Sequence, residues 1–155
     1  MQKGFTIIEL LVTLAILAAL AMVAAPLVEL AAQRQREDEL RRALWSMRDA
    51  IDAYKKAGDE GRFDRPPGDS GYPPRLDTLV EGVIDKTNPN HARIYFLRRI
   101  PRDPMCDCPS RSDEQTWGRR SYASPPDAPS EGNDVYDVYS LSEASGLNGI
   151  AYRKW

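Results

Sequence analysis

The chain has 155 residues and a formal net charge of −2, which allows one small domain together with a membrane segment. A slightly acidic chain does not present the basic surface that nucleic-acid binding requires. Twelve prolines and ten glycines, nearly all after residue 57, indicate a second part that is rich in loops and buries a modest core.

A long apolar run follows a short basic leader at the start of the chain. No charged residue occurs from Leu10 to Val28. About 20 apolar residues, each rising about 1.5 Å in a helix, cover the roughly 30 Å core of a bilayer. The run therefore predicts a membrane-spanning helix. Pro26 lacks an amide hydrogen, so we expect a kink or local melting near the far end of this helix.

Glu9 lies at the rim of the apolar run. An ionised side chain at membrane depth costs on the order of 3 kcal/mol, so this carboxylate is expected to have a partner. If the chain is cut after Gly4, the nitrogen of Phe5 becomes an ammonium within reach of Glu9 of the same or a neighbouring chain. Cleavage would thus create the charge that makes Glu9 tolerable inside a packed bundle.

The segment Lys3–Val12 (KGFTIIELLV) resembles the class III signal of type IV pilin-like proteins. The resemblance implies cleavage between Gly4 and Phe5 by a prepilin peptidase and methylation of the new Phe5 amine. It also implies that Glu9 pairs with the Phe5 amine of another subunit. Pro26 falls where such proteins usually have a proline, so Phe5, Glu9 and Pro26 are the assembly residues that the resemblance assigns.

Two simpler interpretations of the apolar run stay open. A secretory signal cut near Ala21–Ala25 would be removed, and a plain signal anchor would leave Glu9 incidental. Basic residues lie on both sides of the run, so the positive-inside rule does not settle its orientation. A cytoplasmic N-terminus and a periplasmic C-terminal domain, in a single pass of the bacterial inner membrane, follow from the resemblance.

An amphipathic helix is predicted beyond the membrane, to about residue 57, where Gly58 is expected to end it. Its apolar residues recur at spacings of three and four, which predicts a stripe packed on a sheet. The stripe comprises Leu40, Leu44, Met47, Ile51 and Tyr54. We therefore divide the chain into a leader peptide at 1–4, a transmembrane and assembly helix at 5–32, and a periplasmic globular domain at 33–155.

Loops and short elements fill the rest of the chain. Prolines and glycines make 58–74 a loop, a short helix fits 76–84, and 94–100 fits either a helical turn or an extended segment. Alternating β-branched and aromatic residues predict strands near the C-terminus. The candidate strands are 120–124, 135–140 and 149–152. The expected fold is α+β, with a long N-terminal helix packed on a small three-stranded antiparallel sheet.

A second resemblance covers the globular domain discontinuously. An order of segments similar to that of the major (G-type) pseudopilin of type II secretion is formed by Tyr72-Pro73, Leu79-Val80, Leu97–Pro104, Trp117-Gly118 and Val135–Leu141. The resemblance implies a pilin-like fold and a structural, non-enzymatic role in a short periplasmic fibre that pushes substrates through an outer-membrane channel. The implied partners are copies of itself, other pseudopilins, the prepilin peptidase and the inner-membrane assembly platform.

The calcium loop of that family is where this chain departs. The corresponding segment offers oxygens from four side chains, and one of these is charged. They are Ser142, Glu143, Ser145 and Asn148. Because calcium prefers six to eight oxygens with carboxylates among them, a hydrogen-bonded turn is favoured over a weak calcium loop. Calcium is the one cofactor that stays open.

The two cysteines, Cys106 and Cys108, would meet an oxidising compartment in an exported chain. A bridge between them needs a tight turn that brings their Cα atoms within about 7 Å, so bridged and free forms both stay open. Two thiols and the distant His91 fall short of a zinc site, and His91 is expected in a surface loop. No catalytic set of residues stands out, so an enzyme is not predicted.

Two classes of function remain. The first is a structural fibre subunit, most like the secretion pseudopilin, with a type IV pilus or competence pilin as its close rival. The second is a monomeric, membrane-anchored periplasmic binding module that carries the same leader. Genes for a secretion ATPase and an outer-membrane channel beside this one would favour the pseudopilus, and presence of the chain in sheared surface fibres would favour the pilus.

Overall fold

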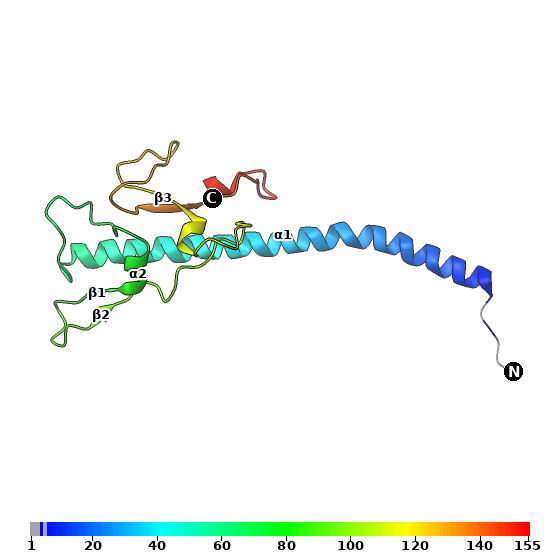
Figure 1. The fold of residues 1–155 in the computed structure, drawn as a ribbon, viewed down its shortest axis with the longest axis horizontal. Coiled ribbons are helices and arrows are strands. Elements are labelled where there is room, and N and C mark those ends of the chain that lie inside the picture. The colour runs from blue at the N-terminus through cyan, green and yellow to red at the C-terminus, as the bar shows by residue number, and fades with distance from the viewer. Residues whose placement is uncertain (1–3, 5) are drawn as a thin grey trace. The chain divides into compact units, whose positions relative to one another are not determined.

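The computed structural model describes residues 4 and 6–155, without the side chains of residues 23–25. The chain divides into two compact units, Met1–Arg36 and Glu37–Trp155. Its longest element is helix α1, Ile7–Asp59 (Figure 1). The others are α2 (Asp77–Glu81), β1 (Val83–Ile84), β2 (Arg93–Ile94), β3 (Trp117–Arg120), β4 (Asp137–Ser140) and the 3₁₀ helices η1 (Glu114–Thr116) and η2 (Tyr152–Lys154).

Helix α1 ends slightly later in the chain than the sequence predicts. It continues through Gly58 to Asp59, so the prediction that Gly58 ends it is wrong by a few residues. Gly61 has a φ of 71° and donates its N–H to the Gly58 carbonyl at 3.0 Å. Arg62 donates to the Ala57 carbonyl at 3.0 Å. This pair of bonds is the Schellman arrangement, in which a left-handed glycine satisfies the last carbonyls of a helix.

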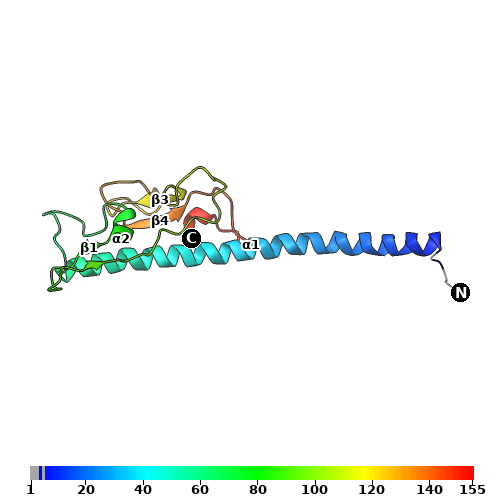
Figure 2. The ribbon, with the colours of Figure 1, turned by 60° about the horizontal axis from the view of Figure 1, so that its bottom comes forward.

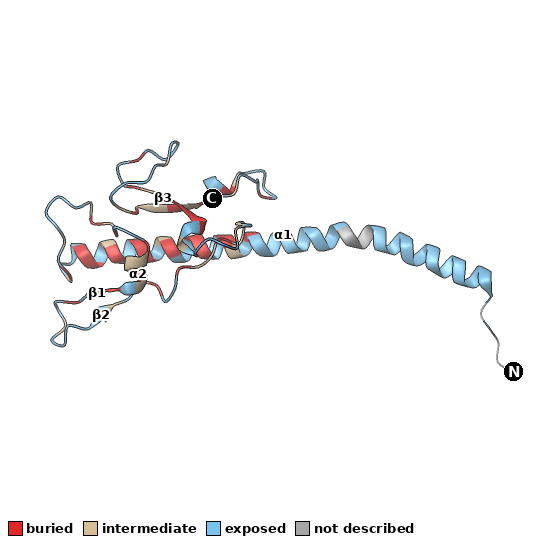
Figure 3. Cartoon of the chain, in the orientation of Figure 1, coloured by how far each residue is buried: buried red, intermediate tan, exposed pale blue. Residues whose placement is uncertain are grey.

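The predicted apolar stripe forms the core of the second unit. Leu40, Met47 and Ile51 are no more than 1% exposed, and Leu44 and Tyr54 are also buried. They pack in one cluster with residues from α2, β3, β4 and η2. Figure 3 shows the buried positions of α1 in the part of the helix that belongs to this unit. The stripe prediction is confirmed, and burial of these side chains is what attaches the small sheets to the helix.

The α+β prediction is confirmed, but the single three-stranded sheet is wrong. The described residues form two two-stranded antiparallel sheets. In one, β1 pairs with β2 through Val83 and Ile94, and in the other β3 pairs with β4 from Trp117 opposite Ser140. Figures 1 and 2 show β3 lying along the second half of α1.

Several predicted element boundaries differ from the observed ones. The first candidate strand was predicted at 120–124 and is observed at Trp117–Arg120, as β3. Residues 121–124 form a turn, in which Ser124 donates its N–H to the Ser121 carbonyl, and two prolines that cannot join a strand ladder follow. The predicted helix 76–84 is shortened to α2, since Gly82, with a φ of 71°, leads directly into β1. Within 149–152, Ala151 forms an isolated bridge with Ser145 before η2 begins.

Candidate functional site

The N-terminal end of α1 carries the predicted processing site. Phe5, the residue expected to become the methylated N-terminus, lies outside the described residues. Gly4 is exposed, and a Cβ built on it would meet no atom within 4 Å. The fold itself therefore does not require a glycine at this position. A need for Gly4 would come from the enzyme that cuts beside it, which stays a prediction.

Thr6 caps the start of α1. The Glu9 N–H donates to Thr6 Oγ1 at 3.3 Å, and the Leu10 N–H donates to the Thr6 carbonyl at 3.2 Å. The spacing is that of a capping box, T-x-x-E, and a carboxylate in the first turn also complements the helix dipole. This cap was not predicted, although the spacing of Thr6 and Glu9 signals it. A capping role of the Glu9 side chain would compete with the assembly role, so an experiment must separate the two.

The first half of α1 is a candidate membrane anchor. Its most apolar 18-residue window has a mean hydropathy of 2.6, and none of that window is buried within the protein. Ile7 is 81% exposed and Leu17 is 61% exposed. A helix that is apolar all round and covered by nothing needs either lipid or other helices around it.

Pro26 lies inside this helix and is exposed. The helix is assigned continuously through it, so the expectation of local melting is not met. The proline still removes one backbone hydrogen bond, to the carbonyl four residues earlier. Its assembly role stays a prediction.

Glu37 holds the C-terminal segment against α1 in the second unit. Its side chain is 4% exposed. Its Oε1 accepts hydrogen bonds from the Leu147 N–H at 2.8 Å and from the Tyr152 hydroxyl at 3.0 Å. A carboxylate from the helix thus satisfies one donor in the segment where the pseudopilin resemblance places a calcium loop and one donor in η2, just after that segment.

The four oxygen-bearing side chains of that segment do not fit a calcium site. Ser142 Oγ accepts the Ala144 N–H at 3.4 Å, and Asn148 Oδ1 accepts the Ile150 N–H at 3.0 Å. Ser145 forms its backbone bridge, and Glu143 supplies the set's one carboxylate. Among the described residues, no group of three or more acidic, His or Cys side chains could hold a metal. No step of the proposed function passes through calcium.

The two cysteines form a disulfide in the structure, with their Cα atoms 5.3 Å apart. Arg102 braces the turn by donating to the Cys108 carbonyl and by an ion pair with Asp113 at 3.3 Å. The tight turn that the sequence required for such a bridge is therefore present. Together, these contacts make residues 102–113 a compact loop.

Asp103 anchors this loop to the sheet. It is 1% exposed and accepts a hydrogen bond from the Ser140 hydroxyl at 2.6 Å and from the Met105 N–H at 2.8 Å. Its own N–H donates to Thr116 Oγ1 at 3.1 Å. Burial raises the pKa of Asp103 above its ordinary value, and the bonds it accepts partly offset that rise. Asp103 thus joins the loop to β4 through its carboxyl and to η1 through its backbone N–H.

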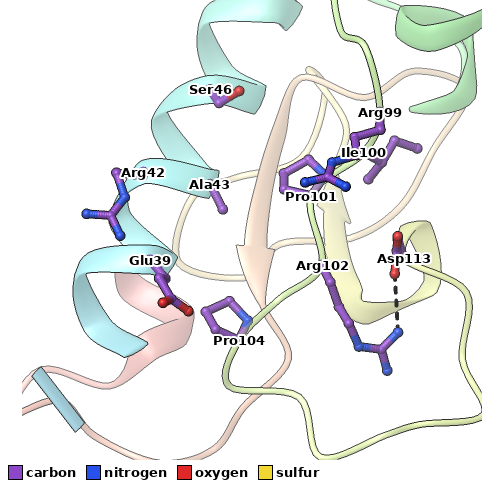
Figure 4. Close-up of a pocket in the computed structure, with 10 residues that line it drawn as sticks. All are labelled: Glu39, Arg42, Ala43, Ser46, Arg99, Ile100, Pro101, Arg102, Pro104 and Asp113. Atoms are coloured by element: carbon purple, nitrogen blue, oxygen red, sulfur yellow. Dashed lines mark hydrogen bonds and ion pairs between the residues drawn. The ribbon is translucent and has the colours of Figure 1, made fainter. Parts of the chain in front are cut away.

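A pocket of about 630 Å³ lies between α1 and the segment before this loop (Figure 4). Arg42, Arg99 and Arg102 line it, and Arg102 is the one that bonds Asp113. Ser46 also lines it, but no His or Cys does so among the described residues. His91 lies in an exposed loop elsewhere, as predicted. Glu39 and Asp113 also line the pocket, so its charge is mixed, and its described lining lacks the paired nucleophile and base of an enzyme.

Comparison with known proteins identifies a motif in the N-terminal segment. A protein-family model described as the prokaryotic N-terminal methylation motif matches residues 1–25. No curated protein and no solved structure matches the chain. The match covers the leader and most of the apolar run and does not extend into the globular unit. The chain thus carries the N-terminal methylation motif that is typical of type IV pilin-like proteins, which are structural rather than catalytic.

Proposed function

We propose that the chain is a structural subunit of a type II secretion pseudopilus, a fibre that drives protein export across the outer membrane. One observation carries the proposal: the methylation motif stands at the start of a helix whose apolar window is wholly uncovered. Such a helix needs lipid before assembly and other helices after it. The choice of a pseudopilus over a pilus or competence fibre rests on the resemblance of the segments from Tyr72 onward.

Processing and assembly are linked in this proposal. The prepilin peptidase removes residues 1–4 by cutting between Gly4 and Phe5, and the Phe5 amine is methylated. Residues 5–32 then span the inner membrane with the N-terminus in the cytoplasm, and residues 33–155 lie in the periplasm. The Phe5 ammonium of one subunit pairs with Glu9 of the next, since an unpaired charge in an apolar bundle costs several kcal/mol. The assembly platform adds subunits and other pseudopilins to the fibre.

The test compares Glu9→Gln with Glu9→Leu. Glutamine can take the third position of a capping box but carries no charge, so it separates the two roles of Glu9. A fibre subunit in which Glu9 pairs with Phe5 should lose assembly in both variants, while membrane insertion and cleavage continue. Crosslinking of intact cells, which shows the ladder of assembled copies, and intact-mass analysis of the extracted protein measure these outcomes.

Glu29→Gln is the matched control, because Glu29 is an exposed carboxylate on the same helix beyond Pro26. It should leave both ladder and secretion unchanged. Normal assembly of Glu9→Gln would assign Glu9 to helix capping alone and remove charge pairing from the mechanism. Absence of any ladder in the wild type would favour the monomeric anchored module. Presence of the chain in fibres sheared from the cell surface, together with normal secretion in the Glu9 variants, would favour a pilus.

A further inference from the structure

A groove in the second unit is lined by large apolar side chains that are exposed to solvent. It lies between α1 and the C-terminal segment and has a volume of about 270 Å³. Trp45 lines one wall and is 68% exposed, and Ile150 lines the other and is 48% exposed. Trp155 also contributes to the lining. An exposed apolar patch rimmed by polar groups is typical of an interaction surface, and tryptophan is among the residues enriched where such surfaces bind.

The rim of the groove is positively charged. Arg41, Arg48 and Lys154 line it, and no Asp or Glu is among the lining residues that the structure describes. Arg41 is paired with Asp38 at 3.1 Å and Arg48 with Asp137 at 2.8 Å, so Lys154 is the described cation of the rim that is left for a neighbour. The guanidinium of Arg41 lies 4.6 Å from the centroid of the Trp155 ring, and Arg48 donates to the Trp155 carbonyl at 2.8 Å. These contacts fix the walls, whereas Lys154 is exposed and makes no ion pair with another described residue. An occupant should therefore combine apolar surface with carboxylates.

One exposed loop of the same chain has this chemistry. Residues 125–134, between β3 and β4, read PPDAPSEGND and contain three carboxylates and no basic residue. Pro126 and Asp127 are exposed, and Asp127 has no ion-pair partner within the described part of the chain. Glu131 is already paired with Arg119, so Asp127 is the carboxylate most available to a neighbour.

We propose that the Trp45 groove binds the 125–134 loop of a second copy of this chain. The inference rests on the proposed function, in which copies assemble. Groove and loop share no residue, so each copy would use its groove for one neighbour and its loop for another. A contact of this head-to-tail kind joins successive copies into a ring where the rotation between them closes and into an open fibre where it does not, and the proposed function requires the fibre. The charges favour this pairing and disfavour groove against groove.

The first experiment places a photoreactive benzoyl-phenylalanine at position 45 of the full chain, in cells that show the assembly ladder. Irradiation should give a covalent dimer in which mass spectrometry finds position 45 joined to residues 125–134 of the other copy. The same replacement at Tyr95, which is 63% exposed and does not line the groove, should give no such product. The inference would be overturned if position 45 crosslinked to another segment, to another protein, to lipid alone or to nothing. The proposed function would still stand in that case if the assembly ladder depends on Glu9.

The second experiment exchanges charges. Lys154→Glu and Asp127→Lys should each weaken the ladder about two- to fivefold, as expected for one exposed ion pair, and the double variant should recover it. Trp45→Ala should weaken it at least about tenfold. Arg153→Glu is the matched control, because it makes the same charge change at an adjacent exposed residue outside the groove. An equal effect of the control, or no recovery in the double variant, would contradict the proposal.

Discussion

Glu37 on α1 and Tyr152, 115 residues later in the chain, share a hydrogen bond of 3.0 Å in which the Tyr152 hydroxyl donates to Glu37 Oε1. The same oxygen accepts the Leu147 N–H at 2.8 Å. One buried carboxylate therefore ties the C-terminal segment to the helix. This segment also forms one wall of the groove at Trp45, so its position matters beyond the stability of the domain.

Replacement of Glu37 by alanine should destabilise the second unit by about 2–4 kcal/mol, because two donors lose a charged acceptor and one of them is buried. Thermal unfolding of the purified protein in detergent, with hydrogen exchange at Leu147, measures the effect. Asp38→Asn is the control: its ion pair with Arg41 is exposed, so the change should stay within about 0.5 kcal/mol. Equal effects of the two changes would show that Glu37 does not hold the segment.

Removal of calcium should leave the melting temperature unchanged. The Leu147 and Tyr152 donors are satisfied by Glu37, and the nearby oxygens do not make a calcium set. Melting the purified protein with a calcium chelator and then with excess calcium tests this. A clear fall in melting temperature that calcium reverses would show that this segment does form a calcium site. The Glu143→Gln variant should then show no such reversal.

Asp103→Ala should cost about 2–5 kcal/mol of unfolding free energy, because the buried donors of Ser140 and Met105 lose their acceptor. Asp103→Asn should cost less and should also change the pH dependence. The pKa of Asp103 is raised by burial, so its contribution is complete below about pH 3.9, the ordinary value of an aspartate, and falls as pH rises through the folded-state pKa. Denaturant unfolding from pH 3 to 8 should therefore show the wild type losing stability relative to Asp103→Asn as pH increases.

The Cys106–Cys108 bridge closes a very short loop, so it should stabilise the fold modestly. The loop-entropy relation for about three residues gives about 1.5 kcal/mol. Reduction of the wild type should therefore lower its melting temperature to that of a Cys106→Ser, Cys108→Ser variant and leave both proteins folded. Two alkylated thiols in protein extracted without a reductant would show that the bridge does not form in the cell.

Local patterns predicted the helix and its buried face well. Leu40, Leu44 and Met47 follow the period of a helix, and burial follows directly from that period. The helix end was less certain, because Gly58 and Gly61 are both plausible stops and only the backbone bonds distinguish them. The sheets were harder to predict than the helix, since strands of two to four residues carry little alternation.

Contacts between distant segments left no signal in the sequence. In the sequence, Glu37 is one of many charged residues on the polar face of a helix, and Asp103 is part of a proline-rich turn. Their partners, Tyr152 and Ser140, lie far along the chain. Trp45 falls off the apolar stripe, and only its exposure beside Ile150 shows that it belongs to a groove. The cap that Thr6 provides at the start of α1 is different, because the T-x-x-E spacing of Thr6 and Glu9 was readable from the start.

Asp85 should produce an acid-sensitive component of stability. It is 5% exposed, its Oδ1 accepts the Thr87 hydroxyl at 2.6 Å, and Arg62 pairs with its other oxygen. The Thr87 hydroxyl and then Arg62 lower the pKa of Asp85 to about 2. Because the folded-state pKa lies below the unfolded one, this contribution is present above about pH 4 and is lost as pH falls through about 2.

Comparison of the wild type with Asp85→Asn isolates that component. The wild type should be the more stable protein at pH 6, and the difference in unfolding free energy should shrink steadily between pH 4 and pH 2, where Asp85 becomes neutral. Asp64→Asn is the matched control, since Asp64 also pairs with a cation but is 85% exposed, and its difference should be small at every pH. Arg62→Met should retain part of the acid dependence, because the Thr87 bond persists without the guanidinium. A difference between wild type and Asp85→Asn that stays constant across this range would mean that the Asp85 carboxylate is not held in its charged form by Thr87 and Arg62.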